Sequence, residues 1–228
     1  GALPRRSAFA TLRRPLLVAA CGVLVLAVIT CASLMYGAVT LSLSQAWSGL
    51  TSESDLFARP VVWQIRFPRT VDAMMVGACL ATAGALLQGV TRNPLADPTI
   101  LGVTAAAGLA SAIVIVANPQ VSQPGIAAAC GVGGLTGAAI LYVIAWRGTV
   151  SPVRLALAGV ALSAFFGAAI VGLLASSRTF LQTSLGFLAG GTYGSACSDF
   201  RNMLPYALPG FAGAFLVSAR LTRLALDD

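Results

Sequence analysis

The sequence contains no histidine and no lysine, and these two absences exclude several classes of protein. Without lysine, the chain cannot form the phosphate-binding loop in which a lysine contacts ATP. Without histidine, it cannot form the Ser-His or Cys-His pairs of hydrolases, and zinc loses one of its usual ligands. We therefore expect no enzyme activity, no resident metal and no cofactor. Any transport would have to be powered by another subunit.

Charged residues are also scarce, at 9% of the chain against 57% hydrophobic residues. Soluble domains contain about a quarter charged residues, so this composition is typical of a protein that lies in a lipid bilayer. All 14 basic residues are arginines, placed singly or in pairs between apolar runs. Such a distribution is typical of membrane topology signals, and it predicts no nucleic-acid partner.

The few acidic residues and cysteines form no pattern that is typical of ion-coupled transport or of metal binding. The seven acidic residues fall at predicted helix ends and loops, whereas a proton- or sodium-coupled carrier needs acids within the membrane. The five cysteines include no C-x-x-C pair, so neither a disulfide framework nor a metal site is expected. The sequence therefore disfavours a secondary carrier that is powered by an ion gradient.

Uncharged apolar runs predict an all-α, polytopic membrane protein, with six spanning helices in a single transmembrane domain over residues 1–228. The polar linker 37–65 is expected outside, with a short interfacial helix. The Gly- and Thr-rich stretch 179–198 is expected to form a short external or re-entrant helix. The expected spans are 16–36, 68–90, 100–117, 124–146, 155–177 and 203–219.

The arginines orient these spans, because cytoplasmic segments carry an excess of basic residues. Residues 1–15 contain four arginines, and placing them in the cytoplasm gives more arginines inside than outside. This excess would shrink if the stretch 179–198 crossed the membrane. The sequence therefore predicts a multi-pass protein with a cytoplasmic N-terminus.

The stretch 66–104 carries most of the functional information. Arg66 and Arg69 stand at the start of a predicted helix whose first turn contains Asp72. The helix dipole favours a carboxylate at that position, and the three-residue spacing allows Asp72 to pair with Arg69. A proton relay is the alternative role for this acid.

A polar turn follows this helix, with prolines at Pro94 and Pro98. Because the residue before a proline avoids the helical conformation, the chain is expected to leave the helix here. Asp97 and Pro98 are expected to be the N-cap and the first residue of the next helix.

Small residues at helical spacing predict close packing between helices, at Gly77, Ala81, Gly84, Gly159, Ser163 and Gly167.

These motifs resemble those of the FecCD-type permeases, the membrane subunits of ABC importers for iron–siderophores, haem and vitamin B12. The resemblance implies a type II ABC importer permease fold in a bacterial cytoplasmic membrane, with ferric siderophore as the favoured cargo. It also implies a second permease copy or a paralogue, cytoplasmic ATP-binding subunits and an external substrate-binding protein. The similar segments are Arg66-Phe67-Pro68-Arg69, Ala83-Gly84-Ala85-Leu86-Leu87-Gln88-Gly89 and Arg92-Asn93-Pro94-Leu95-Ala96-Asp97-Pro98.

The resemblance also assigns roles to particular residues. Arg66 and Arg69 match the family's paired arginines, which are thought to meet acidic residues of the binding protein. Anchoring the helix end to lipid headgroups is the alternative. Asn93 and Leu95 match the family's cytoplasmic gate, with Val153 at the same mouth. The alternative is a turn that only reverses the chain.

The resemblance covers nearly the whole chain but only part of the family's length. Family members have about ten membrane helices, so we expect residues 1–228 to be the N-terminal part of a longer domain, without the coupling helices that contact the ATPase. A truncated membrane scaffold that does not transport is therefore the alternative function.

Overall fold

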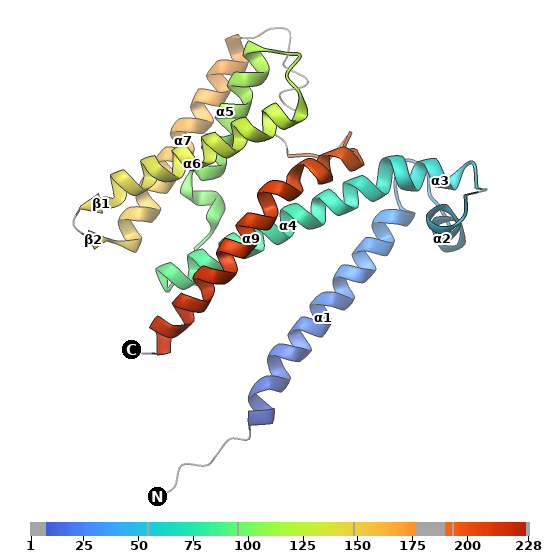
Figure 1. Cartoon of the computed structure of the whole chain (residues 1–228), viewed down its shortest axis with the longest axis horizontal. Helices are drawn as coiled ribbons and strands as arrows, with labels where there is room; N and C mark the ends of the chain where they lie inside the picture. Colours follow the sequence, from blue (N-terminus) through green and yellow to red (C-terminus); the bar gives the residue numbers. More distant parts are fainter. Residues whose placement is uncertain are drawn as a thin grey trace, which may run out of the picture. The chain divides into compact units, whose positions relative to one another are not determined.

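The computed structural model describes residues 8–53, 55–94, 96–147, 149–176, 190–192 and 194–226. Helices dominate the described part of the chain, which confirms the all-α prediction (Figure 1). They are α1 (Ala8–Met35), α2 (Leu43–Thr51), α3 (Ala58–Pro60), the π-helix η1 (Val61–Arg66), α4 (Phe67–Thr91), the 3-10 helix η2 (Pro98–Leu101), α5 (Val103–Ala117), α6 (Gln123–Ala145), α7 (Pro152–Ser176) and α9 (Cys197–Leu226). Between α6 and α7, the two-residue strands β1 (Trp146–Arg147) and β2 (Thr149–Val150) pair antiparallel.

The helix boundaries lie close to those predicted, except at the start of the first span and at the predicted third and sixth spans. Helix α1 begins at Ala8, before the predicted start at residue 16. The third span is shorter than predicted, because Gly102 adopts a φ of 76° after η2, so that α5 begins at Val103. The predicted sixth span lies within the longer α9. Most of the stretch 179–198 lies outside the described residues, and the count of six spans stays a prediction. Four described segments are long and apolar enough to cross a membrane: Arg14–Met35, Ala58–Thr91, Gln123–Ala145 and Pro152–Ser176.

The chain divides into two compact units, Gly1–Val71 and Asp72–Asp228, with the boundary in the first turns of α4. In the first unit, α2 packs against α3 and η1 through small residues. A Cβ added at Gly49 would lie 2.9 Å from both the Ala58 carbonyl oxygen and Val62 Cγ2. Only a glycine allows this approach, which fixes α2 against the start of the second apolar span.

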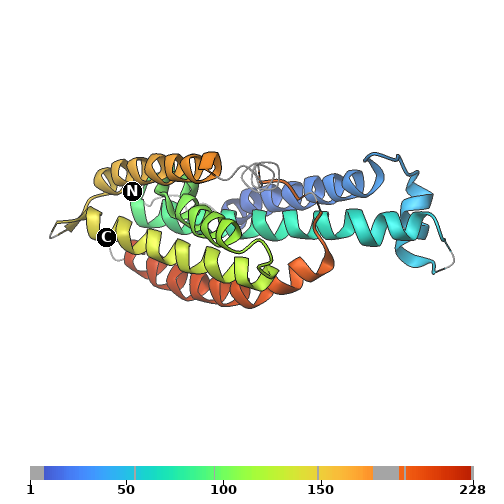
Figure 2. The same cartoon turned by 90° about the horizontal axis from the view of Figure 1, so that it is seen from above.

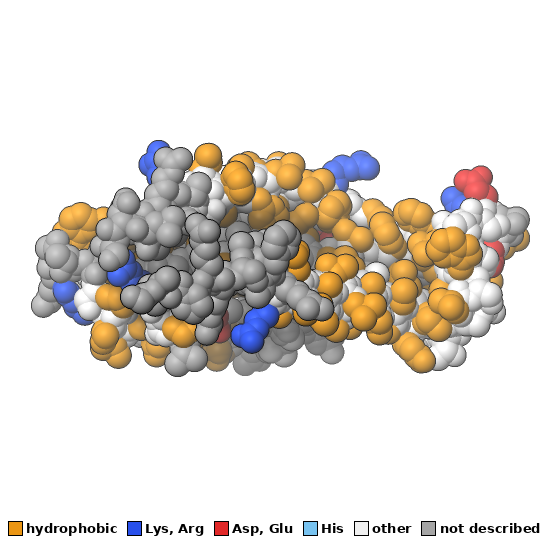
Figure 3. All heavy atoms as spheres, turned by 90° about the horizontal axis from the view of Figure 1, so that it is seen from below, with side chains coloured by type: hydrophobic (Ala, Val, Ile, Leu, Met, Phe, Trp, Pro, Cys, Tyr) orange, Lys and Arg blue, Asp and Glu red, His pale blue; other side chains and the backbone are white. Residues whose placement is uncertain are grey.

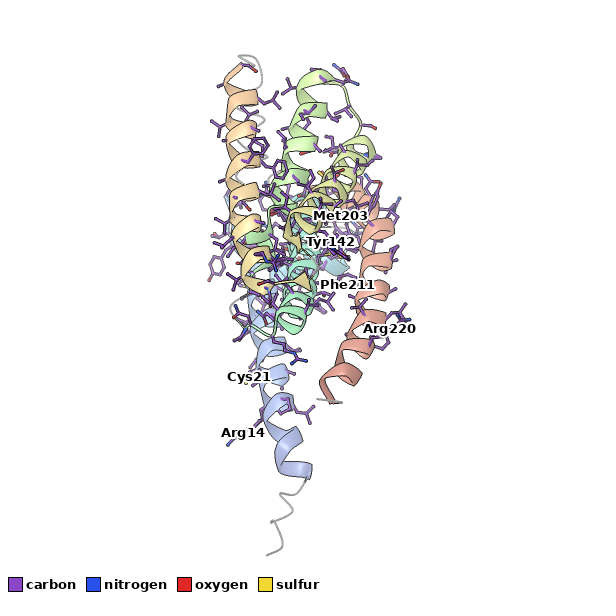
Figure 4. All side chains as sticks on the ribbon, turned by 90° about the vertical axis from the view of Figure 1, so that its left-hand side faces the viewer. Arg14, Cys21, Tyr142, Met203, Phe211 and Arg220 are labelled. Carbon is purple, nitrogen blue, oxygen red and sulfur yellow. The ribbon has the colours of Figure 1, made fainter. Side chains whose placement is uncertain are left out.

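The second unit is built around a bundle of α5, α6 and α7 (Figure 1). Glycines of α6 allow close packing on α5: a Cβ at Gly133 or Gly137 would lie 2.5 Å from the Cβ of Ala110 or Ala106, respectively. Helix α9 lies beside α6 (Figure 2). A groove of about 470 Å³ is lined by residues of α4 and α9, including Phe211, which is labelled in Figure 4.

Hydrophobic side chains cover much of the surface. Among the side chains that are coloured in Figure 3, hydrophobic ones predominate and charged ones are few. Large apolar residues of α1 are more than half exposed, for example Val18 at 72% and Val23 at 67%. Arg14 and Arg220 point away from the ribbon (Figure 4). Such a surface requires an apolar solvent, and it supports the interpretation of a multi-pass membrane protein.

Candidate gate pocket and the Arg66–Arg69 motif

A pocket of about 310 Å³ lies where the end of α4, the turn that follows it and the start of α7 meet. It brings together two of the predicted gate residues, Asn93 and Val153, which are far apart in the sequence. The third, Leu95, lies outside the described residues. The lining is mostly apolar, with Thr91, Asn93 and Asp97 as its polar members. The full lining is Leu87, Thr91, Asn93, Ala96, Asp97, Ile100, Leu101, Pro152, Val153, Leu155, Ala156 and Leu157.

The turn beside this pocket is held by its own hydrogen bonds. Asp97 is the N-cap of η2, with Pro98 as its first residue, and Pro94 is exposed in the turn. One carboxylate oxygen of Asp97 accepts from the Thr99 N–H at 2.8 Å and from the Thr99 hydroxyl at 2.7 Å. The bond from the Thr99 backbone N–H is the main cause that lowers the pKa of Asp97. Gln88 Nε2 of α4 donates to the Ala96 carbonyl at 3.4 Å.

Helix α7 holds η2 from the other side through small residues. The Ser163 hydroxyl donates to the Ile100 carbonyl at 3.0 Å. A Cβ at Gly159 would lie 2.8 Å from Leu101 Cα, and a Cβ at Gly102 would lie 3.0 Å from Leu162 Cβ. The backbones of η2 and α7 are therefore in direct contact, so α7 sets the position of one pocket wall.

The other small residues predicted to pack make fewer contacts within the described chain. A Cβ at Gly84 would lie 3.7 Å from Pro98 Cδ, an ordinary contact. Gly77 and Gly167 have no such neighbour within 4 Å, and Ala81 is exposed. Packing at these three positions therefore stays a prediction.

Arg66 is buried within the first unit, with only 7% of its surface exposed. Its guanidinium donates to the Leu34 carbonyl at 2.6 Å and to the Val39 carbonyl. Leu34 lies in the last turn of α1, where carbonyls have no partner within the helix. A Cβ at Gly37 would lie 3.2 Å from the guanidinium. Arg66 thus caps the C-terminal end of α1 and holds the turn after it.

Arg69 and Asp72 occupy different environments one turn further along α4. Arg69 is partly exposed, whereas Asp72 is 5% exposed, and Asp72 Oδ1 has no hydrogen-bond partner among the residues that the structure describes. Asp72 lies near the Ser195 hydroxyl and the Asp199 carboxylate. The pairing of Asp72 with Arg69 stays a prediction. Among the described residues, no group of three or more His, Cys, Asp or Glu side chains could hold a metal.

Sequence reasoning missed three features that shape these sites: the burial of Arg66, the Ser163–Ile100 bond and the break at Gly102. The burial of Arg66 depends on the carbonyls of Leu34 and Val39, and the Ser163–Ile100 bond joins residues 63 positions apart. Neither contact leaves a local pattern in the sequence. The break at Gly102 had one signal, a glycine directly after Pro98–Leu101, but glycine is frequent throughout this chain.

Comparison with known proteins identifies related transport proteins. The model of the FecCD transport family matches residues 25–228. The chain is 31% identical over 218 residues to the probable siderophore transport system permease protein YfiZ of Bacillus subtilis (strain 168), covering 93% of this chain and 64% of YfiZ. It is 36% identical over 168 residues to the Fe(3+) dicitrate transport system permease protein FecD of Escherichia coli (strain K12), covering 74% of this chain and 52% of FecD.

A solved structure shares the fold. It is an inward-facing conformation of a metal-chelate type ABC transporter, with a TM-score of 0.61 and 29% sequence identity, covering 89% of this chain and 59% of that one. This chain therefore spans between half and two thirds of the length of these three proteins.

Proposed function

Because this chain belongs to the FecCD transport family, we propose that it forms part of the membrane-spanning permease of an ABC importer for a metal chelate, with ferric siderophore as the favoured cargo. The relatives named for siderophore and ferric dicitrate transport support this cargo class. The chain has no lysine for a phosphate-binding loop. ATP hydrolysis is therefore assigned to a separate cytoplasmic subunit.

The observation that carries this proposal is the pocket shared by the turn after α4 and the start of α7. A constriction that opens and closes needs a mostly apolar lining with few polar groups, and Asn93 and Val153 line this pocket together. We assign them, with Leu95, to a cytoplasmic gate. The described lining contains no arginine, so these residues offer no cation that would retain an anionic chelate.

Docking of the external binding protein is assigned to the Arg66–Arg69 motif, with unequal roles for the two arginines. Arg69 is partly exposed and can meet a carboxylate of a partner in a bidentate pair. Arg66 is buried against the end of α1, so it acts by holding the start of α4 in place. A rim arginine contributes mainly to the rate and specificity of association.

The remaining partners follow from the same assignment. The permease would pair with a second copy or a paralogue in the bacterial cytoplasmic membrane, with its N-terminus in the cytoplasm. A Cβ at Gly77 or Gly167 would meet nothing within 4 Å in the described chain, and Ala81 is exposed, so these positions leave room for another helix.

Uptake by reconstituted vesicles tests the function. The protein that carries this sequence is combined with its ATPase and binding protein, and uptake of radiolabelled ferric siderophore, haem and cobalamin is measured with and without ATP. We expect ATP-dependent uptake of a ferric siderophore. If the complex assembles but transports none of the three, the chain is a scaffold and the proposal fails. Uptake that depends on an ion gradient without the ATPase would indicate a secondary carrier.

A further inference from the structure

The short helix α2 has one face that packs on the protein and an opposite face that the described residues leave exposed. Its N-terminus is fixed by a capping box, in which Gln45 N–H donates to Ser42 Oγ at 3.3 Å and Ser42 N–H donates to Gln45 Oε1 at 2.9 Å. Ala46 and Gly49 are buried against the neighbouring helical turns. Leu43 and Trp47, one turn apart, are 64% and 67% exposed.

The turn between α2 and α3 presents two further apolar side chains. Leu56 is 89% exposed and Phe57 is 59% exposed. Asp55 is held in place, because its carboxylate accepts from the Ser48 hydroxyl at 2.7 Å and from the Ala58 N–H at 2.9 Å. These bonds lower the pKa of Asp55, with the Ala58 backbone N–H as the largest cause, so the carboxylate keeps its charge at neutral pH.

The position of α2 shows what covers this face. Within the first unit, one candidate membrane span ends at Met35 and the next begins at Ala58. Helix α2 lies between them in the chain, contacts both α1 and η1, and therefore lies where two spans leave the same side of the bilayer. In Figure 1, α2 and α3 are drawn at the end of α1 that is remote from the N-terminus. Tryptophan is enriched at this depth of a membrane, and helices that lie in the interface carry Trp, Phe and Leu on their apolar face.

We propose that α2 is an interfacial anchor that lies in the plane of the membrane, with Leu43 and Trp47 inserted between the lipid headgroups and Leu56 and Phe57 adding to the same contact. The occupant is the lipid bilayer, because the uncovered face continues from two membrane-spanning segments. The nearest charges are few: Glu53 pairs with Arg59 at 3.1 Å, and the Asp55 carboxylate is held by the Ser48 hydroxyl and the Ala58 N–H. The anchor is therefore apolar, and it does not require anionic lipids.

Tryptophan fluorescence tests this placement directly. Replacing Trp63 and Trp146 by phenylalanine leaves Trp47 as the sole tryptophan of the chain. This variant is reconstituted in phosphatidylcholine vesicles that are brominated either near the headgroup or near the end of the acyl chains. Because an interfacial helix buries its apolar face only about 5–10 Å deep, we expect roughly twofold stronger quenching by the shallow bromines and weak quenching by aqueous iodide.

The matched control keeps Trp63 alone, through Trp47→Phe and Trp146→Phe. Trp63 lies within the candidate span Ala58–Thr91, so its quenching shows that the brominated lipids reach the protein. Strong iodide quenching of Trp47 with no effect of bromine would overturn the proposal, and would indicate a surface for a soluble protein. Stronger quenching by deep bromines would overturn it in favour of a membrane-embedded helix.

A second measurement uses the unaltered sequence. Hydroxyl-radical labelling in lipid nanodiscs should modify Trp47 at least several-fold more slowly than in the denatured protein, although two thirds of its surface is uncovered by the chain. Fast labelling of Trp47 in the folded, lipid-embedded protein would contradict the anchor. Neither measurement depends on transport, so a failure here leaves the proposed function open.

Discussion

Adding one methyl group at Gly159 tests whether α7 sets the wall of the gate pocket. The Cβ of an alanine there would lie 2.8 Å from Leu101 Cα and 3.0 Å from the Ile100 carbonyl oxygen. Carbon atoms pack at about 3.5–4.0 Å, so η2 and α7 would have to separate by roughly 0.7 Å or more. Overpacking of this kind costs about 1–3 kcal/mol, while alanine recovers up to about 1 kcal/mol through its helix propensity. We expect Gly159→Ala to lower the free energy of unfolding by up to about 2 kcal/mol.

The matched control is Gly167→Ala in the same helix, where the added Cβ meets nothing within 4 Å. This variant gains helix propensity without a clash, so we expect it to be stabilised by up to about 1 kcal/mol. Reversible unfolding in mixed micelles, followed by circular dichroism, measures both variants against the parent. If Gly159→Ala is as stable as Gly167→Ala, the close contact between η2 and α7 does not exist and the wall is not set as described.

Three other predictions address docking, the gate and pH. Arg69→Glu should weaken the affinity for the binding protein, measured by surface plasmon resonance. Arg66→Lys keeps the charge but loses the forked geometry, so it should lower thermal stability and leave the affinity of the folded protein unchanged. Equal losses of affinity in the two variants would contradict the different roles of the two arginines. Val153→Trp should fill the pocket mouth and reduce chelate uptake several-fold, while Val153→Ala should not; equal uptake by both would argue against the gate. The pKa of Asp97 is lowered, so its cap should stabilise the protein fully above about pH 4 and lose this effect as the pH falls through the folded pKa. Asp97→Asn should remove that part of the acid dependence of thermal unfolding. An unchanged pH profile in this variant would show that the cap contributes nothing to stability.

The helices could be predicted from the sequence because membrane spans are marked by composition. Long uncharged runs set their existence, and prolines set several of their ends, as at Pro98 and Pro152. Gly102 shows where this reasoning fails. A glycine within an apolar run is compatible with a helix interior, and only the contact with α7 explains why the chain turns there with a positive φ.

The site was harder to predict, because its geometry depends on contacts between distant residues. Arg66 and Arg69 are the same residue type three positions apart, and no local pattern indicates that one is buried and the other partly exposed. What buries Arg66 is the turn after α1, about thirty residues earlier. Asn93 and Val153 were brought together by the family resemblance, and the pocket that they share is found only in three dimensions.

The position of the turn that contains Asn93 depends on α7. Residues 97–102 follow this turn directly and rest on α7 through Gly159 and the Ser163–Ile100 bond, while Gln88 contacts the turn from α4. A larger residue at position 159 would push η2 outward and widen the pocket, since Leu101 and Ile100 both line it. Small residues on α7 therefore do more here than allow helices to approach, because they set the width of the opening beside Asn93.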